Sequence, residues 1–306
     1  MGPYRCGVRS SLRSRSRRGR WWRALACVPL CSVGVWAAAE PGTRAVVATG
    51  TLAPGARPAF ELQTLNVFGL PWPVAPAAAS RCTEIAAALT ASAPDCVALQ
   101  EVWTEAALAP FLQLGWHVAH CAADRWFGRS GLVTLSRHRI EVAEWRAFDA
   151  ECGLDALANK GALRTSLVLP DRRLELWNLH LQSGEAAGAT RRLQIEQMLD
   201  WVEEGSVDRF AAIVGDFNCV PGDAEFTRLA AGLAALGFRH LSCEQPTFAC
   251  AGNALAAGAE PAEIDHVFLR DPERVWTATR VHDRPFVSDH CGVQVRADAR
   301  TAVVSR

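Results

Sequence analysis

Seven polar side chains of this sequence fall within or at the ends of apolar segments. A carboxylate or an imidazole in such surroundings is costly to desolvate unless it is paired or bound to a metal, so their recurrence favours a functional site. Their oxygen donors suit a hard divalent cation, and an imidazole titrates near neutral pH and can transfer protons. Considered singly, Asn66 or Asn218 is equally well explained as a turn or capping residue, and His180 as a satisfied core histidine. The seven residues are Asn66, Glu101, His180, Asp216, Asn218, Asp265 and His290.

Apolar segments separated by turn residues predict the strands that carry these side chains. The clearest is 211–214, a continuous apolar run that stops at Gly215-Asp216 and is typical of a strand covered on both faces. Two helices are predicted where apolar residues share a face, over 82–89 and over 195–202. Strands and helices mixed in this way indicate an α/β sandwich with sheets inside and helices outside. Further strands are expected at 62–68, 97–99, 132–135, 162–169, 174–181, 264–269 and 292–295.

Charge is distributed unevenly along the 306 residues. Residues 1–39 carry eight Arg and no acid, and the other 24 basic and 32 acidic residues leave the rest of the chain at −8. This balance argues against binding of nucleic acid through a broad basic face. The basic start and an apolar run of about 16 residues ending in three alanines predict a signal peptide over 1–39. A retained membrane anchor is the alternative, although the run is shorter than the roughly 20 residues of a membrane span.

A single large domain is expected after this segment. Residues 40–58 are rich in Pro and Gly and predict an extended leader. Residues 59–300 contain no visible boundary and no internal repeat, and they are long enough to bury a sizeable core.

Eight of the eleven cysteines follow the predicted signal, and none forms a C-x-x-C pair of the zinc or redox kind. An oxidising destination would allow some of them to pair. Disulfides are expected between Cys121 and Cys152 and between Cys243 and Cys250. Three cysteines lie in apolar segments and are expected to be buried thiols: Cys82, Cys96 and Cys219.

Six short motifs carry a resemblance to a known family, in order and spacing. They are Leu65-Asn66-Val67, Leu99-Gln100-Glu101-Val102-Trp103, Asn178-Leu179-His180-Leu181-Gln182, Gly215-Asp216-Phe217-Asn218, Ile264-Asp265-His266 and Ser288-Asp289-His290. Over residues 61–296 the sequence resembles the endonuclease/exonuclease/phosphatase superfamily. The resemblance implies a four-layer α/β/β/α sandwich over 59–300, with two packed central sheets flanked by helices, and a metal-dependent phosphoric diester hydrolase.

The resemblance also implies a magnesium site. Glu101 is expected to be the principal ligand, with Asn66 nearby and Asp289 reaching the metal through a water, because hard cations prefer oxygen donors and keep several waters. Mn²⁺ and Co²⁺ are the alternative ions.

The remaining motif residues are expected to handle the attacking water. His290, oriented by Asp265, is implied as the general base, since a carboxylate partner fixes the imidazole tautomer. His180, Asp216 and Asn218 are implied to position that water or to stabilise charge on the phosphorane.

Within the superfamily, the sequence is similar to the neutral and bacterial sphingomyelinases. Asn159-Lys160-Gly161 opens a strand where those enzymes carry a similar element near the substrate phosphate, and Lys160 is the only lysine among 32 basic residues. A chance surface lysine is the alternative. The segment 249–263 has no aromatic residue, unlike the membrane-entering hairpin of secreted members, so Trp72 and Trp126-Phe127 are the candidate interfacial anchors.

The sequence therefore predicts a secreted or periplasmic phosphodiesterase. The expected reaction is hydrolysis of sphingomyelin to ceramide and phosphocholine, with a phospholipid or other phosphodiester as substrate, peripheral membrane contact and a monomeric state. A secreted endonuclease or another phosphoesterase of the superfamily is the main alternative, and a binding module that has kept the fold is a third.

Overall fold

The computed structural model describes residues 45–51, 59–121, 130–205 and 210–297. The predicted signal peptide over 1–39 and the candidate anchor Trp126-Phe127 lie outside these residues. Among the helices of the described segments, none combines the length and the hydropathy that a membrane crossing requires.

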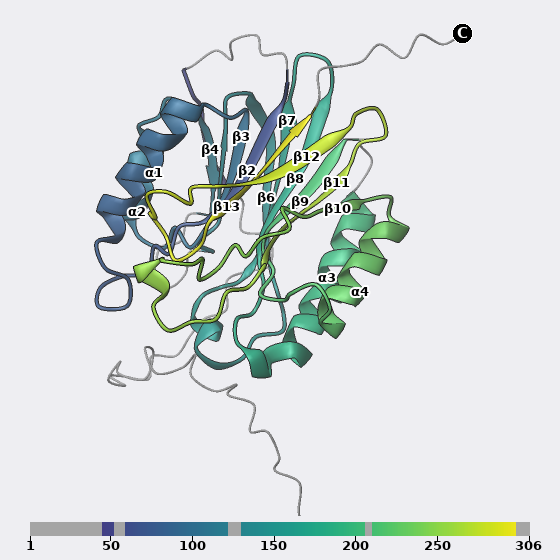
Figure 1. Cartoon of the computed structure of the whole chain (residues 1–306). Helices are drawn as coiled ribbons and strands as arrows, with labels where there is room; N and C mark the ends of the chain where they lie inside the picture. Colours follow the sequence, from purple (N-terminus) through teal and green to yellow (C-terminus); the bar gives the residue numbers. More distant parts are fainter. Residues whose placement is uncertain (1–44, 52–58, 122–129, 206–209, 298–306) are drawn as a thin grey trace, which may run out of the picture.

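Two β-sheets form the centre of the molecule (Figure 1). The first has seven strands in the order β1-β4-β5-β3-β2-β13-β12: Val46–Ala48, His117–His120, Val133–Ser136, Cys96–Gln100, Glu61–Asn66, Gly292–Ala297 and Trp276–Val281. The second has six strands in the order β10-β11-β9-β8-β7-β6: Arg239–Leu241, Asp265–Arg270, Ala211–Asp216, Arg173–His180, Gly161–Val168 and Arg139–Ala147.

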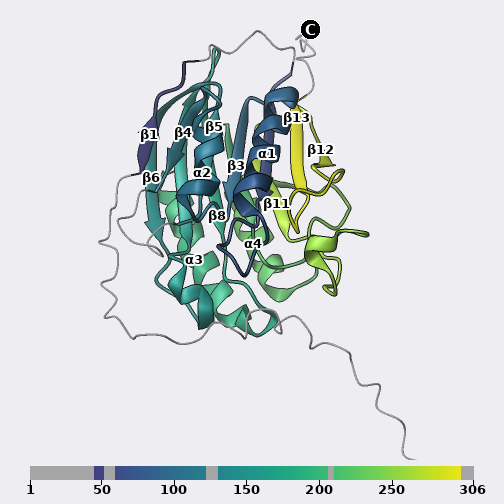
Figure 2. The same ribbon diagram turned by 90° about the vertical axis from the view of Figure 1, so that its left-hand side faces the viewer.

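Two pairs of helices cover the outer faces of these sheets. Helices α1 (Ala78–Ser92) and α2 (Glu105–Leu112) lie on one side, and α3 (Gly188–Gly205) and α4 (Ala224–Ala235) lie on the other (Figures 1 and 2). Short 3₁₀ turns occur at Gly153–Leu157, Glu185–Ala187 and Ala254–Ala256. This arrangement confirms the predicted four-layer α/β/β/α sandwich.

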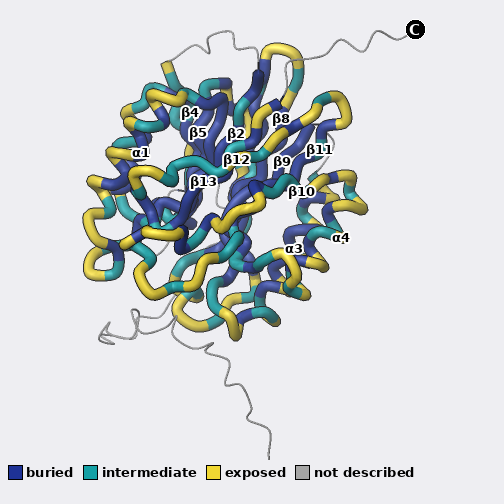
Figure 3. The backbone as a smooth tube through the Cα atoms, viewed as in Figure 1, coloured by how far each residue is buried: buried dark blue, intermediate teal, exposed yellow. Residues whose placement is uncertain are grey.

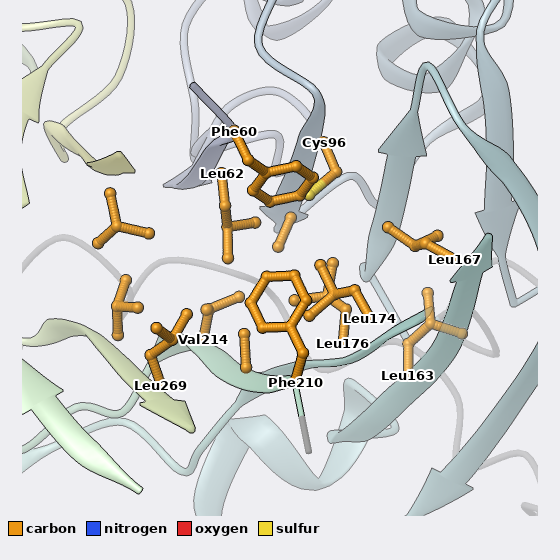
Figure 4. Packing of buried hydrophobic residues seen from close by; sticks show 14 of the residues in the cluster. Phe60, Leu62, Cys96, Leu163, Leu167, Leu174, Leu176, Phe210, Val214 and Leu269 are labelled. Atoms are coloured by element: carbon orange, nitrogen blue, oxygen red, sulfur yellow. The ribbon is translucent and has the colours of Figure 1, made fainter. Parts of the chain in front are cut away.

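Apolar side chains fill each of the three spaces between the four layers. The central cluster joins the inner faces of the two sheets and includes Phe60, Leu62, Leu176 and Phe210 (Figure 4). A second cluster lies under α3 and α4, and a third under α1 and α2. The central strands are therefore buried on both faces, whereas the helices, the connecting loops and the edge strands carry the exposed residues (Figure 3). Polar groups placed on these strands are consequently held in surroundings of low polarity.

Each strand and helix predicted from the sequence is present within a few residues of its expected place. The strands that the sequence pattern missed are short or lie at sheet edges. Strand β6 carries Arg139, Glu141, Glu144 and Arg146 because it is an edge strand with an exposed face. The predicted leader over 40–58 contributes β1, which pairs with β4.

Neither predicted disulfide is formed in the described part of the chain, so these two expectations are corrected. The backbone of Cys152 is held by Gln182, whose amide bonds both its N–H and its carbonyl. Cys121 instead lies in the central core cluster between the sheets. The thiols of Cys243 and Cys250 each donate to a different nearby carbonyl, and do not join each other.

Candidate active site

The strand directions bring the predicted residues to one edge of both sheets. Strand β2 is parallel to β3, and β8 is parallel to β9, so the carboxyl ends of all four strands meet there. Strands β11, β13 and β7 run antiparallel to these neighbours and begin at the same edge. The predicted polar residues lie at these strand ends, or within one or two residues of them.

Glu101 follows directly after β3 and has an unusual environment for a carboxylate. Its backbone is left-handed, with φ 62°, and Gly69 packs so closely that a Cβ atom there would lie 2.2 Å from the Glu101 carbonyl oxygen. Such strained conformations cluster at functional sites. Oxygen Oε1 accepts a 3.0 Å hydrogen bond from Asn66 Nδ2, while Oε2 is buried and has no hydrogen-bond partner among the described residues.

The pKa of Glu101 is raised to about 7, first by burial and next by the nearby carboxylate of Asp289. Burial also raises the pKa of Asp289 itself. Both carboxylates are therefore desolvated, the charge of Asp289 opposes the ionisation of Glu101, and Oε2 of Glu101 has no hydrogen-bond partner among the described residues. A divalent cation with oxygen ligands fits this end of the site, because it supplies the charge that both carboxylates need. We call Asn66, Glu101 and Asp289 the acidic end.

Asn66 connects the acidic end to the rest of the site. Its Nδ2 donates to Glu101 and also to Asp216 Oδ2, at 3.0 Å in each case, while its Oδ1 accepts from the backbone N–H of Phe68. In this arrangement the amide orients both carboxylates. Whether Asn66 also touches a metal stays a prediction.

Asp216 is at the centre of the site. Besides the bond from Asn66, its Oδ2 lies 3.5 Å from His180 Nε2 and 3.8 Å from His290 Nε2. Its strand β9 can pack tightly against β8 because the preceding residue is Gly215, where a Cβ atom would lie 1.9 Å from the Leu179 carbonyl oxygen. The Gly-Asp-Phe-Asn motif therefore combines a close strand contact with a buried carboxylate.

His290 and Asp265 form a buried dyad. Nδ1 of His290 lies 2.8 Å from Asp265 Oδ2, so Nε2 faces Asp216 and the interior of the site. Burial by itself lowers the pKa of His290, but Asp265 and the other carboxylates outweigh it and raise the pKa well above its ordinary value. Thr247 Oγ1 accepts from the backbone N–H of Asp265 and so fixes the start of β11.

His180 also lies beside Asp216, but its pKa is shifted in the opposite direction to that of His290. Its Nε2 lies 2.9 Å from Lys160 Nζ, and burial together with the Lys160 charge lowers the pKa of His180 to about 3. It is therefore neutral at physiological pH. Its Nδ1 is buried and has no partner among the described residues, so it is available to a ligand.

Lys160 is buried behind His180. Its ammonium lies 2.8 Å from Asp155 Oδ2, donates to the Leu181 carbonyl and contacts His180. These three partners occupy the three N–H donors of the ammonium. These contacts make Lys160 a positioning residue for His180. The expected direct contact between Lys160 and a substrate phosphate remains a prediction, as does a role for the neighbouring Asn159.

Asn218 lies beside these groups. Its backbone is left-handed, with φ 50°, its N–H donates to Asp216 Oδ1, and its Nδ2 donates to the Leu181 carbonyl. We call these residues the imidazole end: His180, Asp216, Asn218, Asp265 and His290, together with the Lys160–Asp155 pair that supports His180.

Three residues that support the site were missed in the sequence. Asp155 forms an ion pair with Lys160, and no feature of the sequence around Asp155 indicated this role. Arg81 is buried and donates to the carbonyls of Val67, Phe68 and Val287; its place beside the apolar face of the predicted helix was the available signal. Gln100 donates to Asn178 Oδ1 across the two sheets, and both residues belong to the family motifs.

The protein is an α/β/β/α sandwich in which carboxylates and histidines gather at one edge of the two packed sheets. This fold and site define a class of proteins with a candidate metal-assisted active site. The chain belongs to the Endonuclease/Exonuclease/phosphatase family, whose model matches residues 64–290.

Two curated relatives are similar over part of their length. Sphingomyelin phosphodiesterase 5 of Danio rerio is 30% identical over 162 residues, covering 42% of this chain and 30% of that protein. Phospholipase C of Staphylococcus aureus is 26% identical over 149 residues, covering 45% of each chain. The chain thus matches less than half the length of either relative.

Solved structures show the same fold over more of the chain. SmcL superposes with a TM-score of 0.67 and 18% identity, covering 78% of this chain and 99% of that one. A beta toxin variant from Staphylococcus aureus with bound magnesium ions gives a TM-score of 0.66 and 17% identity, covering 77% and 98%. At these identities the likeness establishes the fold.

Proposed function

We propose that the protein is a secreted or periplasmic, Mg²⁺-dependent phosphodiesterase that hydrolyses sphingomyelin to ceramide and phosphocholine. The observation that carries the proposal is the geometry around Asp216. Asn66 joins Asp216 to Glu101, whose buried Oε2 has no hydrogen-bond partner among the described residues. Nε2 of His290, in the dyad with Asp265, lies 3.8 Å from Asp216 Oδ2.

The acidic end is the proposed metal site. Glu101 would hold Mg²⁺, with Asp289 close by and Asn66 orienting the ligand carboxylate. Mn²⁺ or Co²⁺ would also suit these oxygen donors. The bound ion would polarise the phosphoryl oxygen and stabilise the leaving oxygen.

The imidazole end is proposed to activate the water. In its neutral form, His290 accepts a proton at Nε2, and Asp265 stabilises the imidazolium that results. Asp216 lies close to both histidines, with Oδ2 3.5 Å from His180 Nε2 and 3.8 Å from His290 Nε2, so its negative charge stabilises the imidazolium of His290 once the proton has been taken. Nδ1 of His180, which is held neutral, can donate to a phosphoryl oxygen, and Asn218 confines this side of the site.

A lipid substrate is supported by three observations. The relatives are named for sphingomyelin phosphodiesterase and phospholipase C activities. The chain after residue 39 carries a net charge of −8, which does not favour a polyanion. Trp72 is 85% exposed on the loop that leads from β2 and Asn66 to α1, where an indole can contact a membrane interface.

The test is hydrolysis by the full chain of sphingomyelin vesicles, phosphatidylcholine vesicles and plasmid DNA, each with Mg²⁺ and with excess chelator. We expect release of phosphocholine from sphingomyelin that stops with chelator. Glu101→Gln is the control for contaminating activity. Cleavage of DNA without lipid hydrolysis would replace the lipid assignment with the endonuclease alternative, and full activity in chelator would overturn the metal site.

A further inference from the structure

A second cluster of metal-ligating side chains lies away from the candidate active site, at the edge of the six-stranded sheet. His240 is on the edge strand β10, His266 is on its neighbour β11, and Glu263 lies just before β11. One ligand atom from each residue lies within 4.8 Å of the other two. His266 is buried, and the other two are half-buried, so an ion can reach the cluster from solvent.

The two imidazoles are spaced as a metal would hold them. His240 Nε2 lies 3.2 Å from His266 Nδ1. Two nitrogens that each lie about 2.0–2.1 Å from a tetrahedral Zn²⁺ are about 3.3 Å apart. Without an ion, His240 donates its Nε2–H to His266 Nδ1, and an ion that replaces this shared proton keeps nearly the same distance between the two nitrogens.

The surrounding groups orient the ligand atoms. His266 Nε2 lies 2.9 Å from the Cys219 carbonyl, to which it must donate, so its Nδ1 carries the lone pair. Ser242 Oγ donates to Glu263 Oε1 at 2.5 Å and fixes that carboxylate. Hydrogen bonds of this kind, from a ligand to a carbonyl or hydroxyl, are the usual outer shell of a metal site.

An apolar wall surrounds the imidazoles. The ring centroid of Phe226, from α4, lies 5.1 Å from that of His240 and 4.8 Å from that of His266, and Phe268 lies 4.9 Å from His240. Burial lowers the pKa of His240 to about 4 and that of His266 to about 3, so both rings are neutral at pH 7, as metal ligands must be.

We propose that His240, Glu263 and His266 form a second metal site, suited to Zn²⁺ or a similar borderline cation, with water as the fourth ligand. Two imidazoles and one carboxylate select such ions over Mg²⁺, which prefers an all-oxygen shell. His266 directly follows Asp265, so an ion here ties the edge strand to the strand that orients the His290 imidazole. The site differs from the acidic end in both its ligands and its metal.

The experiment is equilibrium dialysis of the full chain, without affinity-tag histidines, against Zn²⁺ in the presence of millimolar Mg²⁺. We expect one tightly bound Zn²⁺ per chain, a rise in the melting temperature on binding, and visible absorption of tetrahedral type when Co²⁺ replaces Zn²⁺. His240→Gln and Glu263→Gln should each weaken Zn²⁺ binding by a factor of at least about 100, and Ser242→Ala by about 10.

The matched control is His117→Gln, which removes another half-buried histidine, on β4 of the other sheet. It should leave Zn²⁺ binding unchanged. If His240→Gln and Glu263→Gln bind Zn²⁺ as the wild type does, or if the wild type binds none, the site does not exist. Ser242→Ala tests the cluster without removing a ligand, so a folding defect in the ligand variants does not leave the result open.

Discussion

The two ends of the candidate active site hold their charges in different ways. At the imidazole end, His290 is matched with Asp265, and Lys160 is matched with Asp155. At the acidic end, burial raises the pKa of both Glu101 and Asp289, and the charge of Asp289 raises the pKa of Glu101 further. The protein's own residues thus balance the first end, whereas the charge of the second is the one that the proposed metal would balance.

The comparison shows that the acidic end, unlike the imidazole end, needs a charge that the described side chains do not supply. A buried carboxylate remains ionised only if positive charge or hydrogen bonds compensate its lost hydration. Asn66 supplies one hydrogen bond to Glu101, but the second oxygen has none among the described residues. We therefore expect the ends to respond differently when one group is changed.

The largest effect is expected from Glu101→Gln. The substitution keeps the shape of the side chain and removes the charge that holds the metal, so kcat/KM should fall by about a thousandfold, which corresponds to the several kcal/mol that a metal contributes. Steady-state kinetics with Mg²⁺ titration measures this. Retention of most activity would show that the acidic end is not the metal site.

Asp265→Asn should act on the imidazole end with a smaller loss, of about a hundredfold to a thousandfold. The asparagine no longer supplies the charge that raises the pKa of His290, so the ring should titrate at lower pH. NMR titration of the His290 ring and kcat measure the two effects. Asp271→Asn is the matched control, because Asp271 is a buried carboxylate just after the other end of β11.

Lys160→Met should reduce kcat by about tenfold to a hundredfold, because Lys160 holds His180 in place. The variant should also raise the pKa of His180, which the Lys160 charge helps to lower, and shift the acid limb of the kcat profile upward. A rise in KM with kcat unchanged would instead favour a direct contact between Lys160 and the substrate phosphate. Arg164→Met, on the same strand β7, is the control, and Lys160→Arg tests the fit of the ammonium.

The smallest effects are expected in stability without metal, with opposite signs at the two ends. The pKa of Glu101 is about 7 in the folded protein and 4.5 in the unfolded chain, so the contribution of this carboxyl group to stability falls as pH rises from 4.5 to 7. Glu101→Gln should therefore raise the free energy of unfolding at pH 8 by about 3 kcal/mol.

The carboxylate of Asp155 behaves in the other direction. Although burial opposes it, the ion pair with Lys160 lowers the pKa of Asp155 from 3.8 to about 2. Its stabilisation is present above pH 3.8 and is lost as pH falls through 2, so Asp155→Asn should cost about 2 kcal/mol at pH 7. Urea unfolding in chelator at pH 2, pH 3.5 and pH 8 compares the variants. Equal pH dependence of the two would contradict the difference between the ends.

Much of the site was predictable because its residues interrupt apolar segments. Asp216, Asp265 and His290 could be identified as a group, since each is a polar residue at or near the end of a strand that is otherwise buried. Their order along the chain also carries the family resemblance, and the strand ends at which they lie follow from the apolar runs.

The supporting contacts could not be predicted from the pattern. The pairing of Asp155 with Lys160, and of Gln100 with Asn178, joins segments from different parts of the chain. The expected disulfides failed for the same reason: cysteine spacing does not say whether two thiols meet, and Cys121 lies in the core between the sheets.

The sequence by itself determined the strands that carry the site, the helices over 82–89 and 195–202, the sandwich class and the residue types of the site. The direction of β11 along β9, which places Asp265 beside His290 and His266 beside His240, was decided only by the tertiary structure. Successive side chains of a strand point to opposite faces of its sheet. Which face meets the other sheet and which meets the helices depends on how both layers pack, because each layer buries its apolar side only against a partner.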